Sequence, residues 1–290
     1  MQQVEMRLAD ISPGEDYALS WPRFPERYEG AAEKFPGLPL LVVDDQGRVV
    51  CGHDYLLLLR QRGETGCRVL RVRLAAADAL LLNYNLSNRL FGLNLYEKLL
   101  FVKKISPLLG DTEIRRRAEL GFALNEPLRQ ALDLLLSDPF RPGLAAGRVG
   151  LKTALQLAGM AETDRLALLA VFQSCGFSES QQGLVVQMLE ETAFREKKAI
   201  AALLAADGPV SLLAGEMPQK KFLAALHGLR YPAWELREQE WQAWQKKAAA
   251  GAGLSLAHAP YFANEEIQVI LTVKNRLQAE KMLAGLKKIL

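Results

Sequence analysis

The stretch LPLLVVDDQGRVVCGHDYLLLLRQRGETGCRVLRVRL (38–74) decides the fold of the N-terminal part of the chain. Its apolar start, 38–45, predicts a buried strand, Gln46-Gly47 turns the chain, and RVVC (48–51) returns as the hairpin partner. Gly52 then opens an apolar helix that ends at Gly63, and CRVLRVRL (67–74) predicts the next strand. This order of strand, turn, strand, helix and strand indicates a small α/β unit, which we place at residues 1–80.

Beyond residue 78 the apolar periodicity becomes helical and stays so to about residue 206. Capping residues predict helix starts at Asp111, Asn125 and Ser178. The first of these helices is expected to stop at Gly121, and the last to run over 179–205. An apolar stripe predicts a further helix: Leu95, Leu99, Leu100, Val102 and Ile105. Residues 81–206 therefore read as a helical domain.

Residues 207–290 have a third character, which predicts a small α+β module. Trp241 and Trp244 share a helical face and are expected to pack in a core. The stretch 248–260 resembles a linker, 266–275 alternates as a strand, and 279–290 predicts an amphipathic helix. The strand edge and the apolar surface would be covered if two chains paired, so we expect a homodimer through this module. The alternative is a monomer in which the strand completes a sheet within 207–290.

Composition narrows the function classes. No window holds the roughly 18 apolar residues of a membrane span, and the charged start lacks a signal-peptide core, so the chain is expected to be cytoplasmic, without a membrane partner. The three cysteines and three histidines lack metal-ligand spacing, so no metal site is expected. Residues 96–152 carry ten Lys or Arg against seven Asp or Glu, an excess equal to the net charge of +3. Basic charge in this segment permits contact with nucleic acid.

Three motifs, in order, resemble those of the ParB family. The hairpin, glycine and helix of 42–72 are similar to the family segment in which "GERR" opens a helix. LLLNYNLSNRLFGLNLYEKLL (80–100) resembles the "ENLQR..L.P.E.A" stretch, and TEIRRRAELGFALNEPLRQALDLL (112–135) resembles the helix-turn-helix. LAAGRVGLKTALQLAGM (144–160) follows, as in the family. The resemblance implies a ParB/sulfiredoxin-like N-terminal domain, a helix-turn-helix domain and a C-terminal dimerisation module, an α+β protein overall.

The resemblance also implies a nucleotide pocket. Its residues would be Gly52, His53, Asn85 and Arg89, and in the family they hold CTP with magnesium. The two arginines of the family motif are replaced here by Asp54 and Tyr55, and Tyr84 stands at the acidic position of the second motif. Loss of two charge-assisted contacts indicates a degenerate pocket, so we expect no cofactor. The same segment resembles sulfiredoxin, in which a nucleophilic cysteine lies in the turn from the glycine into the helix. In this chain that position holds His53, and Cys51 lies before Gly52.

The helix-turn-helix implies double-stranded DNA as partner, because its second helix enters the major groove with polar side chains. The expected contacts are Arg115, Arg116, Arg117, Asn125, Arg129, Gln130 and Lys152. Lys103, Lys104 and Arg148 would flank them on phosphates. The implied function is that of a chromosome or plasmid partition factor, with a partition ATPase as a further partner.

Two alternatives stay open at this point. One is an enzyme, a CTPase- or nuclease-like protein that hydrolyses or transfers phosphate in the same pocket. Its base would come from Asp44, Asp45 or Asp54, of which the first two are in turn sequence. The other is an interaction module without either activity.

Overall fold

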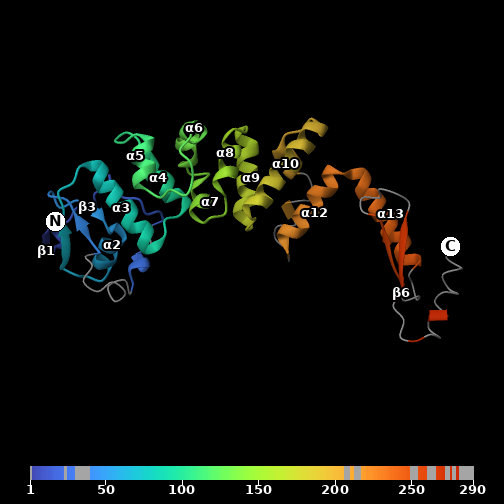
Figure 1. The fold of residues 1–290 in the computed structure, drawn as a ribbon, viewed down its shortest axis with the longest axis horizontal. Helices are drawn as coiled ribbons and strands as arrows, with labels where there is room; N and C mark the ends of the chain where they lie inside the picture. Colours follow the sequence, from blue (N-terminus) through green and yellow to red (C-terminus); the bar gives the residue numbers. More distant parts are fainter. Residues whose placement is uncertain are drawn as a thin grey trace.

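The computed structural model describes residues 2–22, 25–29, 40–205, 210–211, 217–248, 254–259, 266–271, 275 and 279–280. The elements follow one another along an elongated molecule, from the N-terminal sheet to a C-terminal hairpin (Figure 1). The class is α+β, as the sequence predicts. None of the described helices is both long and apolar enough to cross a bilayer.

Four strands form the N-terminal sheet, in the order β1-β4-β2-β3. They are β1 (Gln2–Arg7), β2 (Val42–Val43), β3 (Val49–Cys51) and β4 (Gly66–Arg71). The predicted hairpin of β2 with β3 is confirmed, and β4 lies parallel to β2. The sequence did not predict β1, an edge strand antiparallel to β4 that has no fully buried residue.

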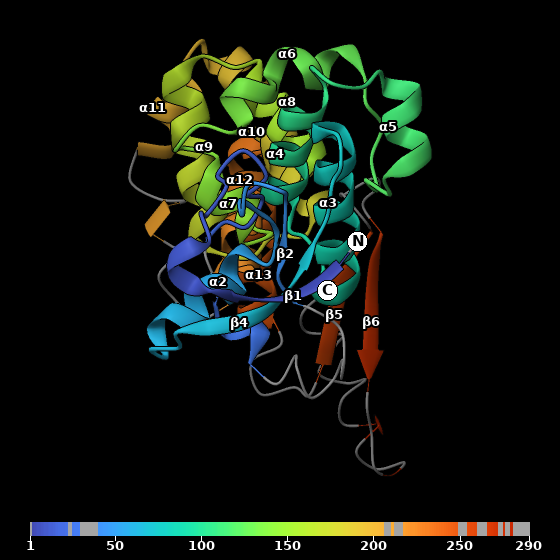
Figure 2. The ribbon, with the colours of Figure 1, turned by 90° about the vertical axis from the view of Figure 1, so that its left-hand side faces the viewer.

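The sheet lies between two helices, α2 (His53–Gln61) and α3 (Ala76–Phe91) (Figure 2). Alternate residues of β2 and β3 serve the two faces, because successive side chains of a strand point in opposite directions. Val43 and Val49 share a core with Leu56 and Leu59 of α2, whereas their neighbours Val42 and Val50 belong to the core that contains α3. That second core continues without interruption to α12. Helix α3 thus joins the sheet to the helical part.

The middle of the chain is helical, as predicted. Its helices are α4 (Leu95–Ile105), α5 (Asp111–Arg117), α6 (Glu126–Leu135), α7 (Arg141–Ala145), α8 (Leu151–Ala158), α9 (Glu162–Ser174), α10 (Glu179–Glu196) and α11 (Ile200–Ala205). Helices α5 and α6, with the connection 118–125, take the place of the expected helix-turn-helix. The predicted caps at Asn125 and Ser178 are confirmed, the second as a full capping box.

Two helix limits in this part differ from the prediction. Asp111 is not the cap of α5: Gly110 holds that position, and the helix ends at Arg117 because Ala118 is extended. The helix predicted over 179–205 is two helices. Lys197 adopts a left-handed conformation, with φ of 53°, which ends α10 before α11 begins.

The C-terminal part contains α12 (Pro218–Arg230), α13 (Pro232–Ala248), β5 (Leu254–His258) and β6 (Ile267–Leu271). The predicted linker 248–260 was wrong in part, because β5 lies inside it and pairs antiparallel with β6. Trp241 and Trp244 lie against each other, with 4.9 Å between ring centroids, but Trp244 is 37% exposed, so the expected core packing is wrong for this residue. Of the final predicted helix, 281–290 lie outside the described residues.

Candidate nucleic-acid interface

A polar pocket between α3 and α5 brings together residues that the sequence assigned to two different sites. It has a volume of about 410 Å³. Asn85 and Arg89 come from α3, where a nucleotide was expected, and Arg115, Arg116 and Arg117 come from the last turn of α5, where DNA was expected. One acidic side chain, that of Glu119, also lines the pocket. Four arginines converge here from two helices.

The four guanidinium groups differ in their partners. Arg116 is held by Glu113 at 2.7 Å, and Arg117 by Asp78 at 2.6 Å. The hydrogen bond from Arg116 lowers the pKa of Glu113. Arg89 and Arg115 are exposed and make no ion pair or hydrogen bond to any residue that the structure describes. Two cations of the pocket are therefore available to an anionic ligand.

Contacts of α3 fix the end of α5 beside it. The Asn85 side-chain amide donates to the backbone carbonyl of Arg117, with 3.1 Å between Nδ2 and O. One residue earlier, the hydroxyl of Tyr84 donates to the carbonyl of Glu119 at 2.7 Å. Tyr84 is fully buried and stacks on Phe101 at 4.1 Å, and burial raises its pKa to about 12. The two helices thus hold the pocket in a defined shape.

A second pocket, of about 570 Å³, lies between α4, the α5–α6 connection and the start of α8. Lys98 and Lys152 line it, together with Asn125 and Glu179. Neither lysine forms an ion pair with a described residue. The Asn125 side chain accepts from the Leu128 amide as the cap of α6, so its oxygen is engaged within the protein.

The two pockets adjoin along the chain. Residues 118 and 119 line the first pocket, and the following residues, beginning at 120, line the second. These residues belong to the connection between α5 and α6, which passes from the first pocket to the second. Arg89 and Arg115 line the first pocket, and Lys98 and Lys152 line the second; we call these four cations the basic track.

Three of the other residues expected on DNA are held by contacts within the protein. Arg129 on α6 forms an ion pair with Asp111 of α5, and the Gln130 amide donates to Glu126 at 3.0 Å. Lys103 is paired with Asp133. The exposed face of α6 therefore carries charges that are largely neutralised, and neither Arg129 nor Gln130 lines the two pockets.

The residues expected at the start of the nucleotide motif lie elsewhere. Gly52 caps α2 with φ of 92°, and a Cβ there would lie 2.2 Å from the carbonyl oxygen of Leu40, so only glycine fits. His53 is buried, with Nε2 3.1 Å from the Gly14 oxygen, and lines a pocket of about 270 Å³ with Glu15 and Arg60. That pocket does not include Asn85 or Arg89.

Two chemical features of this region bear on the enzyme alternatives. Cys51 is buried, and burial raises its pKa to about 12, so its thiol is protonated at neutral pH and is a poor nucleophile. In the described residues, no cluster of three or more His, Cys, Asp or Glu side chains is arranged to hold a metal ion.

Sequence reasoning missed Lys98 and the joining of Arg89 with Arg115. Lys98 lies on the polar side of α4, a common place for a solvated lysine, and its neighbours in the pocket come from 120–125 and 150–155. Such contacts depend on how the helices pack, and no local signal in the sequence marks them.

No family model matches the sequence, and no curated protein matches it. Among solved structures, the chain is similar to a Pnob8-like ParB-N domain, with a TM-score of 0.37 and 12% sequence identity. The similarity covers 79% of this chain and 97% of that chain. The chain is an α+β protein.

Proposed function

We propose that this protein binds the phosphate backbone of double-stranded DNA along the basic track. The observation that carries the proposal is the convergence of Arg89 and Arg115 on one pocket, both without an ion pair among the described residues. Unpaired guanidinium groups are strong phosphate ligands, because their planar N–H donors match the phosphate oxygens.

An extended anion fits the track better than a single small one. Lys98 and Lys152 continue the positive charge into the adjoining pocket, and the α5–α6 connection runs from one pocket into the other. Phosphates repeated along a duplex can meet several such cations in turn, and each contact releases counterions into solution. The neutralised face of α6 favours binding that depends on the backbone more than on base edges.

The test measures DNA affinity as a function of salt concentration. The variant Arg89→Ala/Arg115→Ala/Lys152→Ala removes three cations of the track, and we expect the log–log slope to fall by about 0.9 for each lost phosphate contact. A matched control, Lys220→Ala/Lys221→Ala/Lys246→Ala on α12 and α13, removes three cations away from the track. If both variants lose affinity equally, binding reflects overall charge and the proposed site is wrong.

The implied partition role and partition ATPase are finer proposals that rest on the sequence resemblance. A homodimer through the C-terminal module would present two basic tracks to one duplex.

A further inference from the structure

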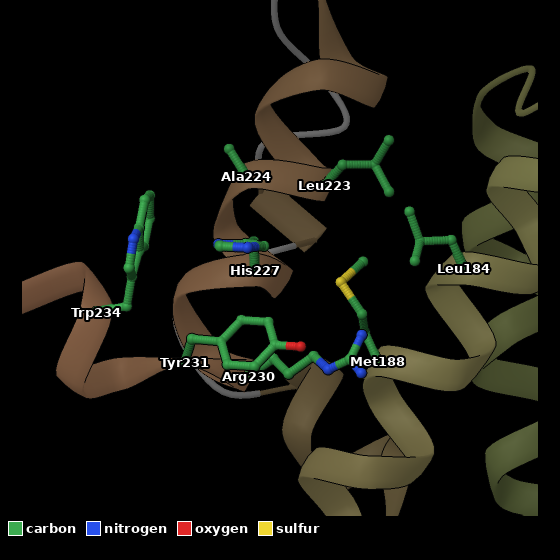
Figure 3. Close-up of a pocket in the computed structure, with 8 residues that line it drawn as sticks. All are labelled: Leu184, Met188, Leu223, Ala224, His227, Arg230, Tyr231 and Trp234. Atoms are coloured by element: carbon green, nitrogen blue, oxygen red, sulfur yellow. The ribbon is translucent and has the colours of Figure 1, made fainter. Parts of the chain in front are cut away.

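A cavity lined by α10, α12 and the start of α13 shares no lining residue with the two pockets of the basic track and has a composition of its own. It lies where α10 and α12 pack together and the chain turns at Tyr231 into α13, and its volume is about 760 Å³ (Figure 3). Pockets for small molecules occupy about 300–1,000 Å³. Leu184 and Met188 from α10 and Leu223 from α12 give it an apolar side.

Three ring side chains form the opposite wall. His227 lies between Tyr231 and Trp234, with 4.9 Å between ring centroids in each pair. The interplanar angles are 55° and 84°, so the three rings are tilted against one another and present both ring edges and ring faces. Aromatic pairs in such offset or edge-to-face arrangements gain about 0.5–1.5 kcal/mol beyond burial of area. A flat ring entering the cavity would meet this geometry.

The wall is held in place before any ligand arrives. Arg195 of α10 donates to the carbonyl oxygens of Leu229 and Arg230 at the end of α12, at 2.6 Å each. Arg230 forms an ion pair of 2.6 Å with Glu191 of α10, and its guanidinium lies 4.9 Å from the Tyr231 ring centroid. These contacts hold α10 and α12 together at the entrance of the cavity. Less conformational entropy is therefore lost when a ligand binds.

The polar groups of the cavity can all donate hydrogen bonds. Arg230 is paired with Glu191 through Nε, but its Nη groups, the His227 ring and the Tyr231 hydroxyl make no hydrogen bond to a described residue. None of the 8 lining residues is acidic. Leu184 and Tyr231 are each 41% exposed, so the apolar side and the ring wall both reach solvent. The cavity suits a ligand with an apolar flat body and acceptor oxygens.

We propose that this cavity binds a planar aromatic anion, a ring system that bears a carboxylate or a similar acidic oxygen group. The ring would lie between Leu184 of α10 and His227 of α12, and the anionic group would accept from the Arg230 Nη groups or from Tyr231. This site is separate from the basic track and does not depend on the DNA-binding proposal.

The test uses 1-anilinonaphthalene-8-sulfonate, a planar aromatic anion whose fluorescence rises on binding, with the full chain. We expect one site per chain, and affinity about tenfold higher than for N-phenyl-1-naphthylamine, which has the same rings without the sulfonate. Ala224→Phe, which fills the cavity from an exposed position of α12, should abolish binding. Ala243→Phe, on α13 outside the cavity, is the matched control and should bind as the natural chain does.

Three results would overturn the proposal. The first is binding of the sulfonate probe to Ala224→Phe with unchanged affinity. The second is equal affinity for the charged and uncharged probes, which would make the cavity an apolar site only. The third is loss of probe binding as protein concentration rises, which would assign the cavity to contact with a second copy. Near-ultraviolet circular dichroism of Ala224→Phe, expected to match that of Ala243→Phe, excludes loss of the fold as the cause of lost binding.

Discussion

Glu113 holds Arg116 within α5, with 2.7 Å between Oε1 and Nη2. Since the same carboxylate lies 3.8 Å from Arg117, it partly neutralises two of the four arginines of the pocket between α3 and α5. The protein thus limits the charge that this pocket offers to an anion.

Glu113→Gln should therefore strengthen DNA binding. The change frees Arg116 and removes a negative charge next to the proposed phosphate site, so we expect higher affinity and a salt slope steeper by about 0.9 if Arg116 gains one phosphate. Stability should change little, because exposed ion pairs contribute about 0–1 kcal/mol. Glu235→Gln on α13 makes the same change of net charge elsewhere. If both variants gain the same DNA affinity, net charge and not the position of Glu113 controls binding.

Tyr84 gives a prediction about pH. Its pKa of about 12 in the folded chain lies above the ordinary tyrosine value of 10.0, mainly because burial disfavours the phenolate. A raised pKa means that the folded state favours the neutral phenol. The contribution of this phenol to the free energy of unfolding is complete below pH 10 and is lost as pH rises toward 12. The folded chain should lose stability over this interval.

The variant Tyr84→Phe isolates that effect. At pH 8 it should be less stable by about 1 kcal/mol, because the hydrogen bond to the Glu119 carbonyl is lost. At pH 11 the difference should be smaller, since phenylalanine cannot ionise. Urea unfolding of both proteins at the two pH values measures the difference. A gap that stays constant or widens at pH 11 would contradict the prediction.

What could be predicted from the sequence was local. The β2–β3 hairpin and the cap at Asn125 depend on residues a few positions apart, and both are confirmed. The break at Lys197 was missed because a lysine rarely adopts positive φ and carries no turn signal. Strand β1 was missed because its pairing partner is more than sixty residues away and its side chains are largely exposed.

The site was predictable only in its parts. The arginine run 115–117 and the pair Asn85 and Arg89 were identified, but as separate sites. Their meeting depends on the packing of α3 against α5, which rests on long-range contacts such as that of Asn85 with Arg117. Periodicity shows which face of a helix is apolar, but it does not show which second helix covers it.

The C-terminal hairpin should form the dimer contact. Strand β5 pairs with one edge of β6, and no other strand of the described residues pairs with β6. Ile267 and Val269, alternate residues of β6, are 44% and 37% exposed. Antiparallel pairing of β6 from two chains would satisfy the open edge and cover these side chains. We expect light scattering to give the mass of a dimer.

The variant Ile267→Lys/Val269→Lys should be monomeric at concentrations at which the natural chain is dimeric. Gln268→Lys, which places a charge between them on the other side of β6, should keep the dimer. If the natural chain is a monomer at roughly tens of micromolar, a range in which an interface of −8 kcal/mol would be occupied, the dimer prediction fails. The hairpin would then be complete within one chain.

The pocket at His53 should not hold CTP tightly. A phosphate at the start of α2 would meet helix N–H groups that lie next to the buried carboxyl group of Asp54, where the family motif has an arginine. Arg60, the cation of this pocket, donates to the carbonyl of Ile11 at 2.8 Å, and Glu15 adds a carboxyl group to the lining. Arg60 is thus one cation beside two carboxyl groups, where the family motif would supply two arginines, and the attraction for a triphosphate is correspondingly weak.

Calorimetric titration with CTP and magnesium should detect no binding with a Kd near 1 micromolar, a free energy of about −8 kcal/mol. Addition of duplex DNA should not change this result if the basic track binds phosphates of the backbone alone. Tight binding accompanied by hydrolysis, with both lost in Arg89→Ala, would favour the enzyme alternative instead. In that event the Arg89 pocket, which lies apart from His53, would be the nucleotide site. Loss of CTP binding in Arg89→Ala but not in His53→Ala would identify it.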